Sequence, residues 1–395
     1  KANGNDNTLN VTLDNVNITA KNDAALSVEG AGNTTITLKG DNTLTSDGQH
    51  AGLEHNEKDY YGREDTGKLT ITSGNENGRN TGSLTATGSG ASAGIGSVWN
   101  SGNYSDSGAG DIEITGGDIT AIGASSAAGI GSGCNATGET NITISGTAKI
   151  NARTDQGGAG IGSGSDATGN TNITISGGTI GTAQGGVGNA SGGSGILGKT
   201  MEILAGTIQK AIGGNSTGTG ENDTGGDGIS ASKFTISGGE IQQATGGASP
   251  NGSGGSGIYS STLTISGNAT IGTAQGGDGN ASGGSGILGK TMEILAGTIQ
   301  KAIGGNASNG TGGSGIRSNG NGTLTIKGGK IEQATGGDSE KYGGSGIYSS
   351  SKLTISDSAT IGNAQGGKGK GKSGGSGIYS YGDLTISGGK IQKAT

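Results

Sequence analysis

The chain has 395 residues, 94 of them glycine and one proline, and its formal net charge is −7. The lone proline and the absence of a Gly-X-Y period exclude a collagen triple helix, and a modest acidic charge without a basic face argues against a nucleic-acid partner. The single cysteine, Cys134, excludes an intrachain disulfide framework. No apolar run reaches the roughly 18 residues of a membrane helix, so we expect no membrane span.

Hydrophobic residues make up only 28% of the chain, a content typical of disordered chains or of solenoids. From residue 95 onward a Gly-Ile pair recurs at intervals of 29 to 35 residues, which favours the solenoid. The isoleucines of these pairs are Ile95, Ile130, Ile161, Ile196, Ile229, Ile258, Ile287, Ile316, Ile347 and Ile378.

Each Gly-Ile pair opens a coil that contains three short strands separated by glycine corners. The second strand alternates apolar and polar residues, as in the Leu-Thr-Ile-Ser run at 353–356. The third carries an isoleucine such as Ile361 and ends in Ala-Thr-Gly-Gly or Ala-Gln-Gly-Gly. Because helical periodicity is absent, we predict an all-β, right-handed parallel β-helix of roughly 12–13 three-strand coils.

The position of the longest loops divides the predicted solenoid into two continuous subregions. In residues 1–175 the long connection lies between the first and second strands, and in residues 176–395 it lies between the third strand and the next coil. Residues 179–215 recur at 270–306 with a single change, Val187 against Asp278. A solenoid tolerates such a duplication, because each coil contacts only its neighbours.

The first candidate site is an aromatic and acidic cluster in the long loops near the start of the chain. Aromatic rings suit stacking on sugar rings, and carboxylates suit sugar hydroxyls or calcium; the alternative is that these loops fold over the core edge. The predicted carbohydrate-binding rings are Tyr60, Tyr61, Trp99 and Tyr104, and the predicted metal ligands are Asp59, Glu64, Asp65 and Asp106. We expect no required cofactor, with calcium as the one metal this cluster could take.

The second candidate site is the column of residues that directly follow the Gly-Ile anchors. The residue after an inward isoleucine points outward in a strand. Tyr259, Tyr348 and Tyr379 occupy this column and predict a carbohydrate-binding stripe. The alternative is that these side chains simply pack on one another from coil to coil.

Three further activities are less well supported. Asp227, Asp278 and Asp338 lie in glycine-rich loops, but their spacing does not match the calcium-binding repeats of β-rolls. The outward Thr and Ser ranks suit ice binding, but long side chains such as Lys327 break their flatness. Catalysis on this scaffold needs a basic residue beside acids or paired carboxylates. Only Arg63 with its acidic neighbours offers these ingredients, so we predict that the chain is not an enzyme.

Several segments near the start of the chain resemble the clostridial carbohydrate-binding domain family. They are residues 9–53 with Asn-Thr-Leu-Thr at 42–45, the Lys-Leu-Thr-Ile strand that opens at Lys68, and Gly-Ser-Leu-Thr-Ala-Thr-Gly at 82–88. The resemblance implies a pectate-lyase-like parallel β-helix that binds plant cell-wall polysaccharides and carries calcium sites, although the family's recurrent acidic pattern is missing. The later Gly-Ser-Gly-Ile and Leu-Thr-Ile-Ser coils are similar to repeats in surface proteins of gut Firmicutes.

These patterns predict a non-catalytic, adhesin-like bacterial protein that is secreted or displayed on the cell surface and binds plant or mucosal polysaccharide. The alternative is a protein-binding adhesin or a structural stalk that contacts a host surface protein. No signal peptide is visible, and we interpret the chain as the interior of a larger or processed protein.

Overall fold

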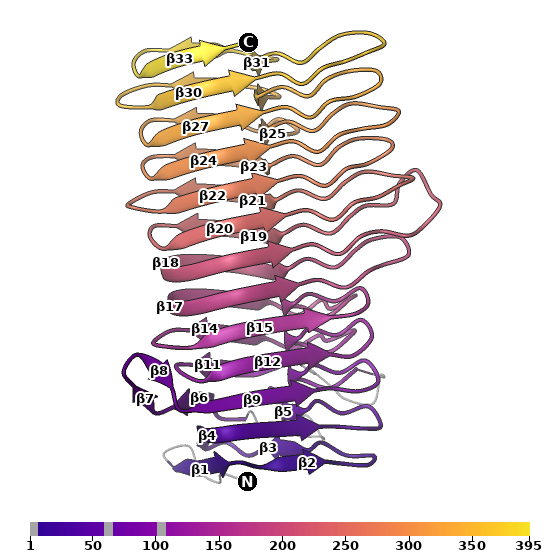
Figure 1. Ribbon diagram of the computed structural model, residues 1–395, viewed down its shortest axis with the longest axis vertical. Helices are drawn as coiled ribbons and strands as arrows, with labels where there is room; N and C mark the ends of the chain where they lie inside the picture. The colour runs from indigo at the N-terminus through magenta and orange to yellow at the C-terminus, as the bar shows by residue number, and fades with distance from the viewer. Residues whose placement is uncertain (1–6, 59–65, 101–107) are drawn as a thin grey trace. The chain divides into compact units, whose positions relative to one another are not determined.

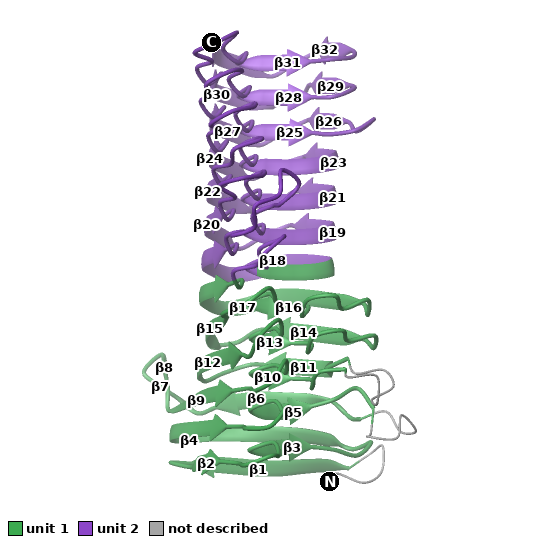
Figure 2. Cartoon of the chain, turned by 90° about the vertical axis from the view of Figure 1, so that its right-hand side faces the viewer, with its two compact units in different colours: residues 1–186, 196–199 green, residues 187–195, 200–395 purple. Residues whose placement is uncertain are grey.

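The computed structural model describes residues 7–58, 66–100 and 108–395, and these residues form β-strands and no helix. Strands of successive coils pair in parallel and build a β-solenoid of about 12 turns, which confirms the predicted parallel β-helix. Within the described residues, no helix is long and apolar enough to cross a membrane. The chain divides into two compact units, Lys1–Gly186 with Ile196–Lys199, and Val187–Gly195 with Thr200–Thr395 (Figure 2).

The first unit stacks its strands in three parallel columns (Figure 1). The first column consists of β3 (Leu26–Val28), β5 (Leu53–His55), β10 (Ile95–Gly96), β13 (Ile130–Gly131), β16 (Ile161–Gly162) and the start of β18 (Ile196–Ile212). The second consists of β1 (Thr8–Asp14), the start of β4 (Asn33–Thr45), β6 (Leu69–Ser73), β11 (Gly110–Ile114), β14 (Thr140–Ile144) and the start of β17 (Thr171–Gln184). The third consists of β2 (Asn17–Thr19), the end of β4, β9 (Gly82–Thr87), β12 (Asp118–Gly123), β15 (Lys149–Thr154) and the end of β17. A short antiparallel pair, β7 (Asn75–Glu76) and β8 (Arg79–Asn80), lies between β6 and β9 in the sequence.

The second unit repeats the same three columns with more uniform coils. Its first column consists of the starts of β19 (Ile229–Ile236), β21 (Ile258–Ile265) and β23 (Ile287–Ile294), then β25 (Ile316–Ser318), β28 (Ile347–Ser349) and β31 (Ile378–Ser380). The second consists of the ends of β19, β21 and β23, then β26 (Leu324–Ile326), β29 (Leu353–Ile355) and β32 (Leu384–Ile386). The third consists of the end of β18, β20 (Glu240–Thr245), β22 (Thr270–Gln275), β24 (Thr298–Ile303), β27 (Lys330–Thr335), β30 (Thr360–Gln365) and β33 (Lys390–Ala394).

Identical positions of successive coils stack in register, which explains how so few apolar residues make a core. The anchor Ile347 pairs with Ile316 on one side and with Ile378 on the other. Ile316 and Ile347 are fully buried. Each inward side chain therefore packs on its own kind above and below, and the thin column needs no other apolar layer.

Core positions compensate for one another in size within a coil. Ser349 and Leu353 are both fully buried in one coil. In another, Met292 replaces the leucine and Gly289 the serine, and a Cβ at Gly289 would lie 2.6 Å from the Met292 Cγ atom. The larger methionine therefore requires the smaller glycine, since cores are packed to high density.

The long loops of the second unit are built on pairs of glycines that stack backbone on backbone. The Gly344 nitrogen donates to the Gly337 carbonyl at 2.9 Å, and the Gly367 nitrogen donates to the Gly344 carbonyl at 2.8 Å. The same zigzag between outgoing and returning arms runs from Gly214 to Gly375 at 2.8–2.9 Å. A Cβ at Gly344 would lie 1.9 Å from the carbonyl oxygen of Gly313. Only glycine fits there, so these loops form an ordered glycine layer beside the strand columns.

Candidate binding groove

The residue after each anchor differs between the two units for a backbone reason. After the first-unit anchors Ile95, Ile130 and Ile161 it is glycine at positive φ, with values of 131° at Gly96 and 130° at Gly131. Beyond Leu197 the second unit keeps this position extended, so it can carry side chains. The column of outward side chains runs Ser230, Tyr259, Leu288, Arg317, Tyr348 and Tyr379 in continuous parallel register.

The rings at the end of this column are stacked. The Tyr348 and Tyr379 centroids lie 5.5 Å apart with an interplanar angle of 12°. On the other face of Tyr348, the Arg317 guanidinium carbon lies 5.3 Å from the ring centroid, in range of a cation–π contact. Tyr348 is therefore covered on both faces, and it can offer a ligand only its edge and its hydroxyl.

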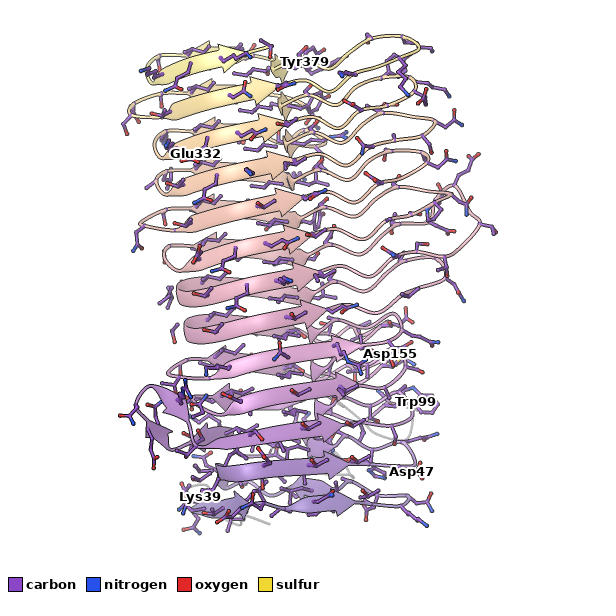
Figure 3. The ribbon with its side chains drawn as sticks, in the orientation of Figure 1. Lys39, Asp47, Trp99, Asp155, Glu332 and Tyr379 are labelled. Atoms are coloured by element: carbon purple, nitrogen blue, oxygen red, sulfur yellow. The ribbon has the colours of Figure 1, made fainter. Side chains whose placement is uncertain are left out.

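The glycine layer supplies the opposite wall. The loop residues Thr311, Tyr342 and Ser373 follow one another in parallel bridges, one per coil. Between this loop column and the strand column lies a groove of about 370 Å³, and Figure 3 shows Tyr379 where β31 meets the loops. We call this feature the binding groove; its lining is Thr311, Gly312, Ser314, Arg317, Tyr342, Gly343, Gly344, Ser345, Tyr348, Ser373, Gly374, Gly375, Ser376 and Tyr379.

The lining is polar and carries no carboxylate. Arg317 is exposed and forms no ion pair within the described part of the chain. At the rim, the Lys372 ammonium lies 4.9 Å from the Tyr342 ring centroid. The nearby Glu340 carboxylate is paired with Lys370 at 2.6 Å. The groove thus offers tyrosine and serine hydroxyls and one guanidinium without an ion-pair partner, which suit a ligand rich in oxygen atoms.

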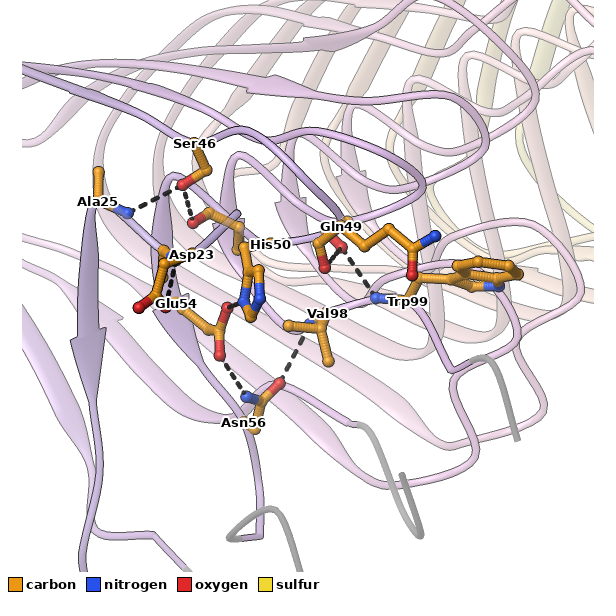
Figure 4. A network of polar contacts seen from close by, with 12 residues as sticks. Asp23, Ala25, Ser46, Gln49, His50, Glu54, Asn56, Val98 and Trp99 are labelled. Atoms are coloured by element: carbon orange, nitrogen blue, oxygen red, sulfur yellow. Dashed lines mark hydrogen bonds and ion pairs between the residues drawn. The ribbon is translucent and has the colours of Figure 1, made fainter. Parts of the chain in front are cut away.

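Most of the predicted N-terminal cluster lies outside the described residues. This applies to the rings Tyr60, Tyr61 and Tyr104 and to the predicted metal ligands Asp59, Glu64, Asp65 and Asp106. Trp99 is described: it is half-buried, and its backbone nitrogen donates to Ser92 Oγ at 2.9 Å (Figure 4). Its role in sugar binding stays a prediction.

A polar network fixes the segment that leads to Trp99 (Figure 4). His50 Nδ1 lies 2.8 Å from a Glu54 carboxylate oxygen, and Asn56 donates to the other oxygen at 3.1 Å. Asn56 Oδ1 in turn accepts from the Val98 nitrogen at 3.1 Å. The hydrogen bond to Glu54 raises the pKa of His50.

The second histidine has a structural role. His55 is fully buried, and its ring nitrogens lie 2.6 Å from the Ala109 carbonyl and 2.8 Å from the Gly67 carbonyl. Burial lowers the pKa of His55, although the two carbonyl contacts oppose this shift. The ring joins three segments of the first unit, and both of its nitrogens are engaged.

The aspartates of the glycine-rich loops do not share one column. Asp278 and Asp338 follow a glycine pair on the outgoing arm, and each accepts a backbone N–H of the next coil at 2.7 Å. Asp227 lies instead directly before the Gly-Ile pair at 228–229, and its carboxylate accepts a hydrogen bond from the Ser256 backbone nitrogen at 2.7 Å. Burial raises the pKa of Asp227 to about 6. Among the described residues, no group of three or more His, Cys, Asp or Glu side chains is placed to hold a metal ion.

One groove residue, Tyr342, was not predicted from the sequence, because it lies in a loop and not in the strand column. Arg317 follows an anchor as Tyr348 does, so the sequence places it in the outward column, although it was not among the predicted binding residues. Tyr342 could not be assigned, because loop length differs between coils and only the stacked backbone sets its neighbours.

Comparison with protein-family models, with curated proteins and with solved structures found no match to this chain.

Proposed function

We propose that the chain is a non-catalytic bacterial solenoid, secreted or displayed on the cell surface, that binds an extended polysaccharide along the binding groove. The main support for this proposal is that Arg317, Tyr348 and Tyr379 pair in parallel register on successive coils. They line one side of the groove, and the hydroxyl-bearing loop residues line the other. Neighbouring strands lie about 4.8 Å apart. Equivalent donors therefore repeat along the groove, as sugar units repeat along a polymer.

The stacked rings define how such a ligand would be held. Because both faces of Tyr348 are covered, a sugar would be held at this ring by hydrogen bonds between its hydroxyls and the tyrosine hydroxyl, and not by stacking on the ring face. Stacking also holds the side chains in place before the ligand arrives, which lowers the entropic cost of binding. The resemblance of the N-terminal segments to clostridial carbohydrate-binding domains supports the same ligand class.

The test is a glycan array of plant, mucin and microbial polysaccharides, probed with the full chain and single variants. We expect binding that Tyr348→Ala reduces at least tenfold. Tyr381→Ala is the matched control, because Tyr381 is 77% exposed in a neighbouring coil and does not line the groove. Circular dichroism of each variant shows whether the β-structure persists.

A parallel arm tests the N-terminal cluster. Loss of binding in Trp99→Ala, with Tyr348→Ala unaffected, would move the sugar site to the first unit, and sensitivity to a calcium chelator would add calcium there. Absence of binding to every glycan would refute the carbohydrate proposal.

The second candidate function is a stalk or protein-binding adhesin that contacts a host surface protein. The near-identity of residues 179–215 and 270–306 favours it, because added coils change the length of a solenoid without changing its chemistry. Deleting one duplicated block leaves a spacer's partner affinity unchanged, whereas it shortens a polysaccharide-binding surface.

A further inference from the structure

A ladder of side-chain hydrogen bonds runs along the outgoing arms of the loops in the second unit. It is formed by the residue that follows each glycine pair, and we call this set the ladder column: Val187, Asn215, Ala248, Asp278, Asn306, Asp338 and Lys368. The side-chain oxygen of one member accepts the backbone N–H of the next. The distance from the backbone nitrogen to the side-chain oxygen is 2.8 Å for Ala248 to Asn215 Oδ1 and 2.7 Å for Asn306 to Asp278 Oδ1. It is 3.0 Å for Asp338 to Asn306 Oδ1 and 2.7 Å for Lys368 to Asp338 Oδ1.

The ladder is interrupted at Ala248, whose side chain carries no oxygen. The backbone N–H of Asp278 lies at the matching position and has no side-chain oxygen of the preceding coil to which it can donate. At this interruption the structure has a notch of about 450 Å³, a volume within the range of small-ligand sites. Its lining is Ala248, Ser249, Pro250, Asp278, Gly279, Asn306, Ala307 and Ser308.

The lining combines an apolar wall with both kinds of hydrogen-bonding group. Ala248 and Pro250 present C–H surface. One carboxylate oxygen of Asp278 holds the Asn306 nitrogen, which leaves the second oxygen to accept. The Asn306 side-chain carbonyl is engaged with Asp338, which leaves its NH₂ group to donate. The Ser308 hydroxyl donates to Asn280 at 3.0 Å and retains its lone pairs.

The one position that differs between the duplicated segments belongs to the ladder column and, in the second segment, lines the notch. Val187 and Asp278 occupy equivalent positions in two otherwise identical stretches of sequence. Val187 is 43% exposed and offers no polar group, whereas Asp278 supplies the carboxylate of the notch. The replacement of valine by aspartate therefore adds a carboxylate to the loop, while the core residues and the glycine pairs of the two segments are the same.

We propose that this notch is a second binding site, distinct from the binding groove, and that it takes a single neutral sugar ring. Adjacent ring hydroxyls can donate to the Asp278 carboxylate and accept from the Asn306 amide and the Asp278 backbone N–H. The apolar wall of Ala248 and Pro250 suits the C–H face of the ring. The Asp278 carboxylate disfavours uronates and other anions, in contrast to the carboxylate-free groove that contains Arg317.

The test is saturation-transfer NMR on the full chain with the methyl glycosides of glucose, galactose and mannose, and with methyl glucuronide as the charged probe. We expect transfer to at least one neutral glycoside, and any transfer to the glucuronide should come from the groove that contains Arg317 and not from the notch. Ala248→Asn should abolish the signal, because the new side chain reaches the Asp278 N–H and fills the notch. Because this change extends the ladder, the thermal midpoint should be kept or raised.

Two controls separate this site from the rest of the molecule. Val187→Asn places the same side chain at another position of the ladder column that lacks a side-chain oxygen, and it should leave the signal unchanged. Tyr348→Ala should also leave it unchanged, so failure of the groove proposal and failure of this one are distinguishable. Absence of transfer to every neutral glycoside, transfer to the glucuronide that Ala248→Asn removes, or a neutral-glycoside signal that survives Ala248→Asn would overturn the proposal.

Discussion

Replacement of Gly344 by alanine should cost far more stability than its position in a loop suggests. The added Cβ would lie 1.9 Å from the Gly313 carbonyl oxygen, so the backbone must shift by more than an ångström to reach ordinary contact. The shift breaks the hydrogen bonds from Gly344 to Gly337 and from Gly367 to Gly344. Each bond contributes about 1 kcal/mol, and forced overpacking costs about 1–3 kcal/mol. We therefore expect a loss of roughly 3–5 kcal/mol in the free energy of unfolding.

Gly320→Ala is the matched control for this prediction. Gly320 has φ of +60°, but nothing lies within 4 Å of an added Cβ. Its substitution should cost only the left-handed backbone strain, about 1–2 kcal/mol. Denaturant unfolding followed by circular dichroism gives both values, and hydrogen exchange locates the coils that open first. If Gly344→Ala were no more costly than Gly320→Ala, the stacked glycine layer would not contribute to the stability of the fold.

Gly289→Ser should destabilise the chain by about 1–3 kcal/mol, because the new serine side chain would collide with Met292. Adding Met292→Leu should restore the free energy of unfolding to within about 1 kcal/mol of wild type. Chemical denaturation of both single variants and of the double variant measures the coupling between the two positions. For Asp227, the pKa is raised in the folded state from 3.8 to about 6, so folding favours the protonated carboxyl and stability falls as pH rises between these values. Relative to Asp227→Ser, wild type should lose up to about 3 kcal/mol between pH ~4 and ~7 in pH-dependent melting experiments, and parallel pH profiles would contradict the assigned burial.

The repeated anchors made the strand columns predictable from sequence. Ile316 and Ile347 occur at the same place in their repeats, and stacking identical residues is the one arrangement that buries them with so little other apolar material. The outward position of Tyr348 followed from strand alternation, and its register with Tyr379 followed from the repeat. The sequence leaves two roles open for these rings, packing on one another and sugar binding. The structure shows that stacking and exposure of the ring edges coexist.

The loops were not predictable in the same way. Glycine pairs in the sequence mark the corners and loops between strands, whereas the structure arranges them as a continuous hydrogen-bonded layer from Gly214 to Gly375. That layer joins residues of different coils, which are distant in sequence. Because glycine has no side chain, the sequence contains no pattern that could reveal which glycines pair. The position of Tyr342 opposite the strand column depends on the same long-range stacking.

The sequence by itself determined the all-β solenoid, its three strands per coil and the residues of its core, because the recurring anchors and strands align the apolar positions of successive coils although the coils differ in length. Only the tertiary structure decided that the glycine loops form a wall, that Arg317 and Tyr342 belong to the groove, and that Ala248 leaves a notch in the ladder column. The physical reason is that these features depend on hydrogen bonds between backbone carbonyls and amides of neighbouring coils. Every residue type has these groups, so the sequence does not show which of them pair.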